Sequence, residues 1–136
     1  MSTRSAVAIP AKDGWAGVYV HWDGYPKARV PGIATIVADG GYAAWKKLLA
    51  DTPQGFSSML ADNVEAYDRG DNDARISGCG QACADCDPLF IEWVYILHPD
   101  LTLEILESAK GDAGWRHHSV FRGSIAEALA RWPATA

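Results

Sequence analysis

The most specific chemical pattern in the sequence is the cysteine cluster "CGQACADC", in which Cys79, Cys83 and Cys86 have the spacing C-x3-C-x2-C. Cysteine thiolates bind zinc or iron–sulfur clusters, and two cysteines separated by two residues can reach one metal from a single turn. Enzymes that hold an iron–sulfur cluster with three cysteines need a larger barrel than 136 residues supply. The spacing therefore favours a structural zinc site, and the alternative is three reduced cysteines packed in a loop.

A structural zinc site needs four ligands, so one must come from another part of the chain. His98 follows the cysteines by about nine extended residues, or roughly 30 Å at 3.3 Å per residue, which places it at the far end of a strand. A hairpin beyond that strand would bring the chain back, so we expect His117 to be the fourth ligand. The alternatives are His118, Asp85 and Asp87.

The second candidate site is the stretch "YVHWDGYP", residues 19–26. Side chains alternate along a strand, so Tyr19, His21 and Asp23 would share one face. Together with Tyr25, this face is predicted to bind a ligand or partner, and exposed aromatic rings would suit a planar group. The alternative is an active site with His21 as general base and Asp23 orienting it. No nucleophile motif, phosphate-binding glycine loop or metalloprotease spacing accompanies the pair, so the sequence favours binding.

These residues require a strand followed by a tight turn. Residues 15–22 are rich in β-branched and aromatic types, and Val18, Val20 and Trp22 on the opposite face are expected in the core. Asp-Gly and then Pro26 end this strand. The residues before it, 1–13, are expected to form a flexible N-terminal tail.

Helical periodicity begins near Pro31. Apolar residues at spacings of three and four predict two short helices, or one helix broken at Gly40-Gly41. The stretch "DTPQGFSSML" is expected to form a loop and a helical turn. Residues 65–88 begin with a charged stretch that has no apolar periodicity. This stretch indicates a surface loop, which also carries the cysteines.

The last part of the chain carries the clearest strand signals. Residues 89–97 and 101–108 predict a hairpin, and residues 115–123 can return as a third strand. Ser124 and Glu127 form a capping-box pattern that opens a terminal helix. The sequence thus predicts a single α+β domain over residues 14–136, with a three- or four-stranded, mostly antiparallel sheet and two to four helices on one face.

Composition narrows the functional classes. The formal charge is −5, from 17 acidic and 12 basic residues, and the longest basic run is a pair of lysines. A nucleic-acid binder needs a positive surface, so we expect no nucleic-acid partner. The sequence has no apolar run near the ~20 residues of a membrane span and no pattern of a secretory signal, so we expect a cytoplasmic protein without a membrane partner.

The chain resembles a family of small uncharacterised proteins of bacteriophages, prophages and integrative elements. The resemblance rests on "YVHWDGYP", on the following helical segment with "GG" and "W", on "GFSSML" and on "EWVYIL", over about residues 16–107. The His-Trp-Asp-Gly-Tyr-Pro run is the most specific part, and the Ala-, Gly- and Trp-rich composition is similar to proteins of actinobacterial phages. The family brings no established activity. It implies an accessory protein made in the host cell.

Two functional hypotheses follow from the sequence. The first is a binding protein for a host protein or a small signalling molecule, with zinc holding the cysteine loop. The second is a small hydrolase or transferase that uses His21 and Asp23. The oligomeric state is left open.

Overall fold

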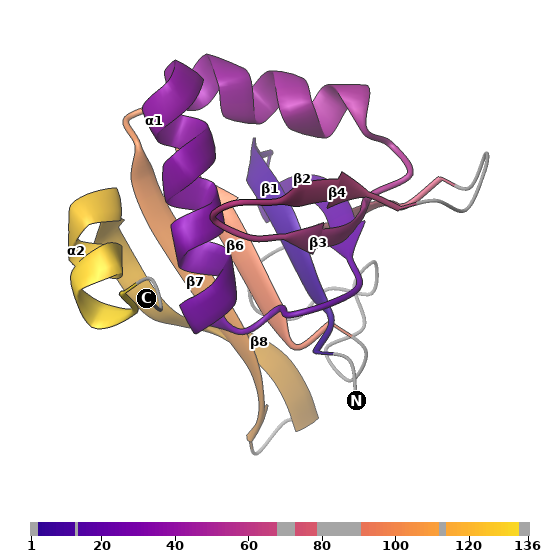
Figure 1. Cartoon of the computed structure of the whole chain (residues 1–136). Helices are drawn as coiled ribbons and strands as arrows, with labels where there is room; N and C mark the ends of the chain where they lie inside the picture. Colours follow the sequence, from indigo (N-terminus) through magenta and orange to yellow (C-terminus); the bar gives the residue numbers. More distant parts are fainter. Residues whose placement is uncertain (1–2, 13, 68–72, 79–90, 112–113, 134–136) are drawn as a thin grey trace.

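The computed structural model describes residues 3–12, 14–67, 73–78, 91–111 and 114–133. Their elements in chain order are β1 (Ser5–Ala11), β2 (Gly14–Val20), α1 (Pro26–Asp51), β3 (Phe56–Met59), β4 (Val64–Ala66), β5 (Arg75–Gly78), β6 (Trp93–Leu97), β7 (Thr102–Gly111), β8 (Gly114–Ser124) and α2 (Ile125–Arg131). Figure 1 shows them around one large twisted sheet.

The sheet has the order β4-β3-β2-β1-β6-β7-β8, and β5 also pairs with β2. It is mixed, because β1 runs parallel to β6 and β2 runs parallel to β3, while the other pairs are antiparallel. The predicted α+β fold with three or four strands and two to four helices is therefore wrong, since the described residues form eight strands and two helices. Strands β3, β4 and β5 have only three or four residues, too few to show an alternating pattern.

The N-terminal segment lies at the centre of this sheet. β1 pairs with β2 on one side and with β6 on the other, and Ser5, Ala6, Val7 and Ala8 are fully buried. The expected flexible tail is therefore wrong for residues 5–11. Small residues have weak strand propensity, and this strand forms because both of its edges are paired.

Helix α1 bends in the middle, as the glycine pair predicts. Gly41 has φ 67° and ψ −157°, a left-handed conformation that favours glycine, and the two arms of the helix meet there at a clear angle (Figure 1). The helix begins at Pro26, five residues before the predicted start at Pro31. The expected helical turn after it is wrong, because residues 56–59 form β3.

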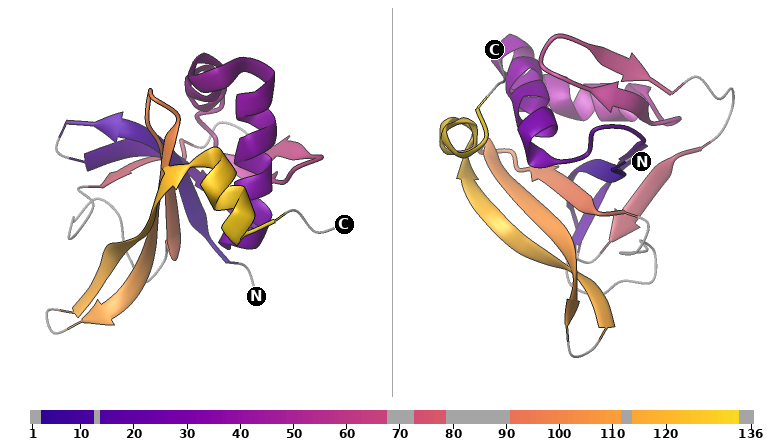
Figure 2. Two further views of the ribbon diagram at one scale, coloured as in Figure 1. Left: turned by 90° about the vertical axis from the view of Figure 1, so that its left-hand side faces the viewer. Right: turned by 60° about the horizontal axis from the view of Figure 1, so that its bottom comes forward.

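The main core lies between the sheet and the helices, both of which cover the same face (Figure 2). It includes Trp45 of α1, whose indole N–H donates a hydrogen bond of 3.0 Å to the carbonyl of Ala8. A second, smaller cluster on other strand positions includes Trp15, Val94 and Leu106. Within the described ranges, no helix is both long and apolar enough to cross a membrane.

The C-terminal elements match the sequence prediction. β6, β7 and β8 form consecutive antiparallel pairs, with a register shift between Ile105 and Leu106. At the start of α2, the Ser124 hydroxyl accepts a 3.0 Å hydrogen bond from the Glu127 N–H, and the Glu127 carboxylate accepts one of 2.9 Å from the Ser124 N–H. These bonds, chiefly the one from the Ser124 backbone, lower the pKa of Glu127. The predicted capping box is confirmed.

Candidate functional site

Four rings gather where β2 ends, and we call Tyr19, His21, Trp22 and Tyr67 the aromatic cluster. The Tyr19 hydroxyl and His21 Nδ1 are 2.6 Å apart and share a hydrogen bond. The His21 ring lies 4.4 Å from Trp22 in an edge-to-face arrangement and 5.4 Å from Tyr67, between ring centroids. These separations mean that the rings contact one another, so a ligand would meet the outer side of the cluster.

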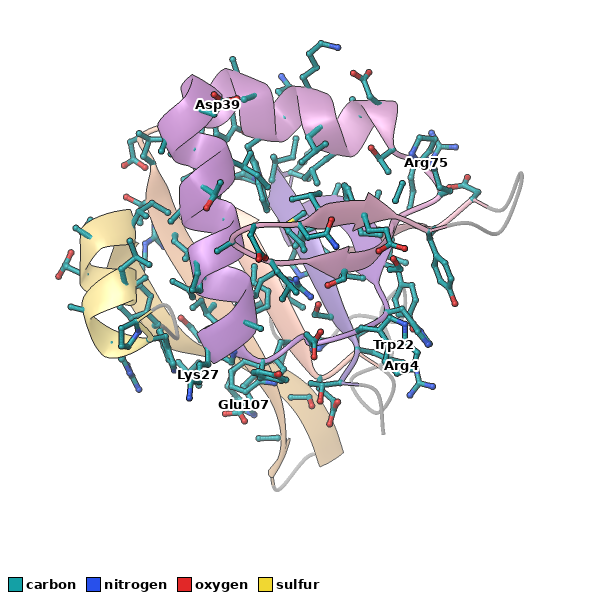
Figure 3. The ribbon with its side chains drawn as sticks, viewed as in Figure 1. Arg4, Trp22, Lys27, Asp39, Arg75 and Glu107 are labelled. Atoms are coloured by element: carbon teal, nitrogen blue, oxygen red, sulfur yellow. The ribbon has the colours of Figure 1, made fainter. Side chains whose placement is uncertain are left out.

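Trp22 forms the exposed part of the cluster. Its side chain is 48% exposed, although the sequence analysis placed it in the core. That prediction is wrong because β2 ends at Val20, so the strand alternation does not extend to residue 22. Figure 3 shows Trp22 at the periphery of the molecule, far from Asp39 at the bend of α1.

The backbone of Trp22 is held on both sides although its side chain is exposed. Its N–H donates a 2.8 Å hydrogen bond to the carbonyl of Ser57, and the N–H of His21 donates one of 3.0 Å to Phe56. Its carbonyl accepts a 3.0 Å hydrogen bond from Nη2 of Arg29. The indole is thus presented from a fixed main chain.

Arg29 is a fully buried cation that joins three segments. Besides Trp22, its guanidinium donates hydrogen bonds to the carbonyl of Met59 and, at 3.3 Å, to the hydroxyl of Ser5. Burial lowers the pKa of Arg29 to about 10, so it stays charged at neutral pH. A buried charge needs such partners, and here they come from β1, β3 and the end of β2.

The turn after Trp22 forms a separate unit. Asp23 has φ 56°, in the left-handed region that aspartate tolerates, and its carboxylate accepts a 3.2 Å hydrogen bond from the Tyr25 hydroxyl. The charge of Asp23 is the main cause that raises the pKa of Tyr25. Gly24 packs so closely on β1 that a Cβ atom would lie 2.5 Å from the carbonyl oxygen of Thr3. The turn is therefore fixed against the core.

The predicted face of Tyr19, His21 and Asp23 is only partly assembled. Tyr19 and His21 are hydrogen bonded, whereas Asp23 bonds to Tyr25 and shares no hydrogen bond with His21 among the described contacts. An aspartate that orients a catalytic histidine must bond to its ring. The arrangement therefore gives no support to a His21–Asp23 catalytic pair, and it suits stacking on Trp22 instead.

The predicted metal ligands are placed only in part. Cys79, Cys83 and Cys86 lie outside the described residues, as do the alternative ligands at positions 85 and 87. His117 is buried, and its Nε2 donates a 2.7 Å hydrogen bond to the carbonyl of Ile91, while the neighbouring His118 is exposed. In the described part of the chain, no three metal-ligating side chains come together.

Sequence reasoning missed two residues of this region. Arg29 lies four residues before the buried Ile33, so the two residues share one face of α1, and this spacing is a local hint that Arg29 faces the core. Tyr67 comes from the charged segment that was expected to be a surface loop. Its contact with His21 depends on tertiary structure, and no local pattern reveals it.

Comparison of the chain with protein-family models, with curated proteins and with solved structures finds no match.

Proposed function

We propose that this protein is a binding protein whose aromatic cluster recognises a planar group on a host protein or a small signalling molecule. The observation that carries this proposal is the half-exposed indole of Trp22 on a backbone hydrogen bonded from both sides. A large apolar ring left in water is informative when the chain around it is well ordered, because folding could have buried it.

The fixed backbone supports binding in a specific way. A recognition residue that is already held in place loses little conformational freedom when the partner arrives. Stacking of a planar group on an aromatic ring contributes about 1–3 kcal/mol. The His21 ring packs edge to face on the indole, and Tyr19 and Tyr67 contact His21 in turn, so the partner would meet the exposed part of the indole.

Two parallel assays test this proposal. Protein purified from producing cells is analysed by native mass spectrometry for a retained small molecule, and immobilised protein is used to capture host proteins. Each assay compares the wild type with Trp22→Ala and with Val64→Ala, a matched control that removes another exposed apolar side chain, 37% exposed on β4.

We expect Trp22→Ala to weaken the retained interaction by about 5- to 150-fold, which corresponds to the loss of one stacking contact. Val64→Ala should bind as the wild type does. The proposal fails if Trp22→Ala keeps every interaction of the wild type, or if the wild type retains neither a small molecule nor a protein.

The similarity of the His-Trp-Asp-Gly-Tyr-Pro run to phage and mobile-element proteins supports a biological setting for this binding. In that setting the chain is an accessory protein that acts in the cytoplasm of the host cell. An acidic chain suits a protein or small-molecule partner better than nucleic acid.

We also propose that Cys79, Cys83, Cys86 and His117 bind a structural zinc ion. The support comes from His117, which is buried and whose Nε2 donates to the carbonyl of Ile91, five residues beyond Cys86. Zinc-bound histidines commonly donate one ring N–H to a carbonyl while the other ring nitrogen ligates the metal. Zinc would then tie the cysteine segment to β8.

Adjacent histidines provide the test of this site. Zinc content is measured by native mass spectrometry for the wild type, Cys86→Ser, His117→Ala and His118→Ala. Loss of zinc in the first two variants and one equivalent of zinc in His118→Ala is the expected result. A wild-type mass equal to the bare chain would contradict the proposal.

A further inference from the structure

A second surface, lined by residues other than those of the aromatic cluster, forms an apolar groove. It has a volume of about 410 Å³ and lies between the C-terminal arm of α1 and the β2–β5 pair. Ile9, Val18, Leu49 and Ile76 supply its apolar lining. This volume falls within the range of roughly 300–1,000 Å³ that small-molecule sites occupy.

Two basic side chains, Lys46 and Arg75, also line the groove. Among the described residues, no acidic side chain lines it. They differ in their partners. Arg75 is held by Asp73 through two side-chain hydrogen bonds of 2.9 and 2.7 Å, and these bonds lower the pKa of Asp73 to about 2. Figure 3 shows Arg75 near the C-terminal end of α1.

Lys46 has no such neutralising partner. Among the described residues, no carboxylate lies within ion-pair distance of its ammonium group, whereas the adjacent Lys47 pairs with Asp51 at 2.5 Å. Although the chain has a net charge of −5, its apolar groove is thus lined by a cation that has no ion-pair partner among the described residues. The combination favours a ligand with a negative end and an apolar body.

We propose that this groove binds a medium-chain fatty acid, with the carboxylate at Lys46 and the chain along Val18, Leu49 and Ile76. The charge at Lys46 selects the acid over a neutral alcohol, and the apolar lining selects a hydrocarbon chain over a short carboxylate such as acetate. This site is separate from the aromatic cluster, so either proposal can fail without the other.

Decanoate, below its critical micelle concentration, is a suitable probe. Its binding to the wild type is measured by isothermal titration calorimetry and located by NMR through the methyl groups of Ile9, Val18 and Ile76. Decanol and decyltrimethylammonium are titrated in parallel. We expect decanoate to bind about tenfold more tightly than decanol, as for one charge-assisted hydrogen bond, and the ammonium compound to bind more weakly still.

Exposed positions on the same helix arm allow two matched pairs of variants. Lys46→Gln should weaken decanoate binding about tenfold, and Lys47→Gln should change it less than about twofold. Ala50→Glu places a negative charge in the groove and should abolish binding, whereas Ala43→Glu, exposed outside the groove, should not. These surface changes leave the core intact, which circular dichroism checks.

Three results would overturn the proposal. The first is an absence of decanoate binding to the wild type. The second is equal affinity of the wild type and Lys46→Gln for decanoate. The third is decanoate-induced NMR shifts that fall on Trp22 and leave the groove methyls unchanged, since these would assign the ligand to the aromatic cluster.

Discussion

The two halves of "YVHWDGYP" differ in what holds them and in what they expose. In the first half, Tyr19, His21 and Trp22 have a hydrogen-bonded backbone and rings that lie at the surface. In the second half, Gly24 and Pro26 are buried, and the Gly24 carbonyl accepts a 2.5 Å hydrogen bond from the buried Tyr95 hydroxyl. One motif therefore combines a surface for contact with an anchor in the core.

Arg29 connects these two halves. It lies in the first turns of α1, three residues after the buried Pro26, and its guanidinium bonds to the carbonyl of the exposed Trp22. Substitutions in the motif should therefore separate into those that reduce stability and those that reduce binding. Four predictions test this separation, from the largest expected change in stability to the smallest.

Replacing Arg29 should have the largest effect. Arg29→Met removes the donor from two buried acceptors and one part-buried acceptor, at a cost of about 1–3 kcal/mol for each buried one, and relief of the desolvated charge offsets part of that. We expect the free energy of unfolding to fall by about 2–4 kcal/mol in urea denaturation. Lys27→Met, at an exposed position in the same turn, should change it by less than about 0.5 kcal/mol. An equal loss in the free energy of unfolding for Arg29→Met and Lys27→Met would contradict the distinction between a residue that anchors the core and a residue at the surface.

Tyr95→Phe tests the anchor at Gly24. Loss of the buried hydrogen bond should reduce the free energy of unfolding by about 1–2 kcal/mol. Burial raises the pKa of Tyr95, so the folded state keeps the proton to higher pH than the unfolded state. The free energy of unfolding of the wild type should therefore decline above about pH 10, the ordinary tyrosine pKa. In Tyr95→Phe this decline should be smaller. The same dependence of the free energy of unfolding on pH in both proteins would contradict the role of this hydroxyl.

Ser124→Ala is a reference far from the motif. It removes the side-chain cap of α2 and should cost about 1 kcal/mol. Because the pKa of Glu127 is lowered in the folded state, the capping contribution is present above the ordinary glutamate pKa and is lost as the pH falls below it. Ser124→Ala keeps the backbone N–H that bonds to Glu127, so the pH test uses Glu127→Ala, whose difference from the wild type in thermal unfolding should be smaller at pH 3 than at pH 7. An unchanged difference would argue against the reciprocal bond to Glu127.

Trp22→Ala should have the smallest effect on stability and a large effect on binding. An exposed side chain contributes little to the core, so we expect a change within about 0.5 kcal/mol in the free energy of unfolding. The same variant should lose the partner interaction. A loss of more than about 2 kcal/mol would instead show that the indole serves the core.

Local patterns in the sequence predicted some elements and not others. The hairpin of β6 and β7, the return strand β8, the capped helix α2 and the break at Gly40-Gly41 depend on neighbouring residues, and the structure confirms them. β3 pairs with β2 across the whole of α1, so local patterns did not reveal it, and β1 was missed because its small residues have weak strand propensity. The number of strands was underestimated for these reasons.

The candidate site was predictable to a similar degree. Alternation along β2 correctly paired Tyr19 with His21, because both follow the strand direction. The alternation stops at the turn, and so Trp22 and Asp23 were assigned to the wrong surroundings. Tyr67 and Arg29 join the region through tertiary contacts, which the sequence reveals only after the fold is known.

Hydrogen exchange at Trp22 reports both the fixed backbone and the exposed ring on a single residue. We expect the backbone amide of Trp22, which is bonded to Ser57, to exchange slowly in NMR, while its indole N–H exchanges rapidly with water. In Arg29→Met the amide should exchange faster. Rapid exchange of the Trp22 amide in the wild type, or strong protection of its indole, would contradict the account.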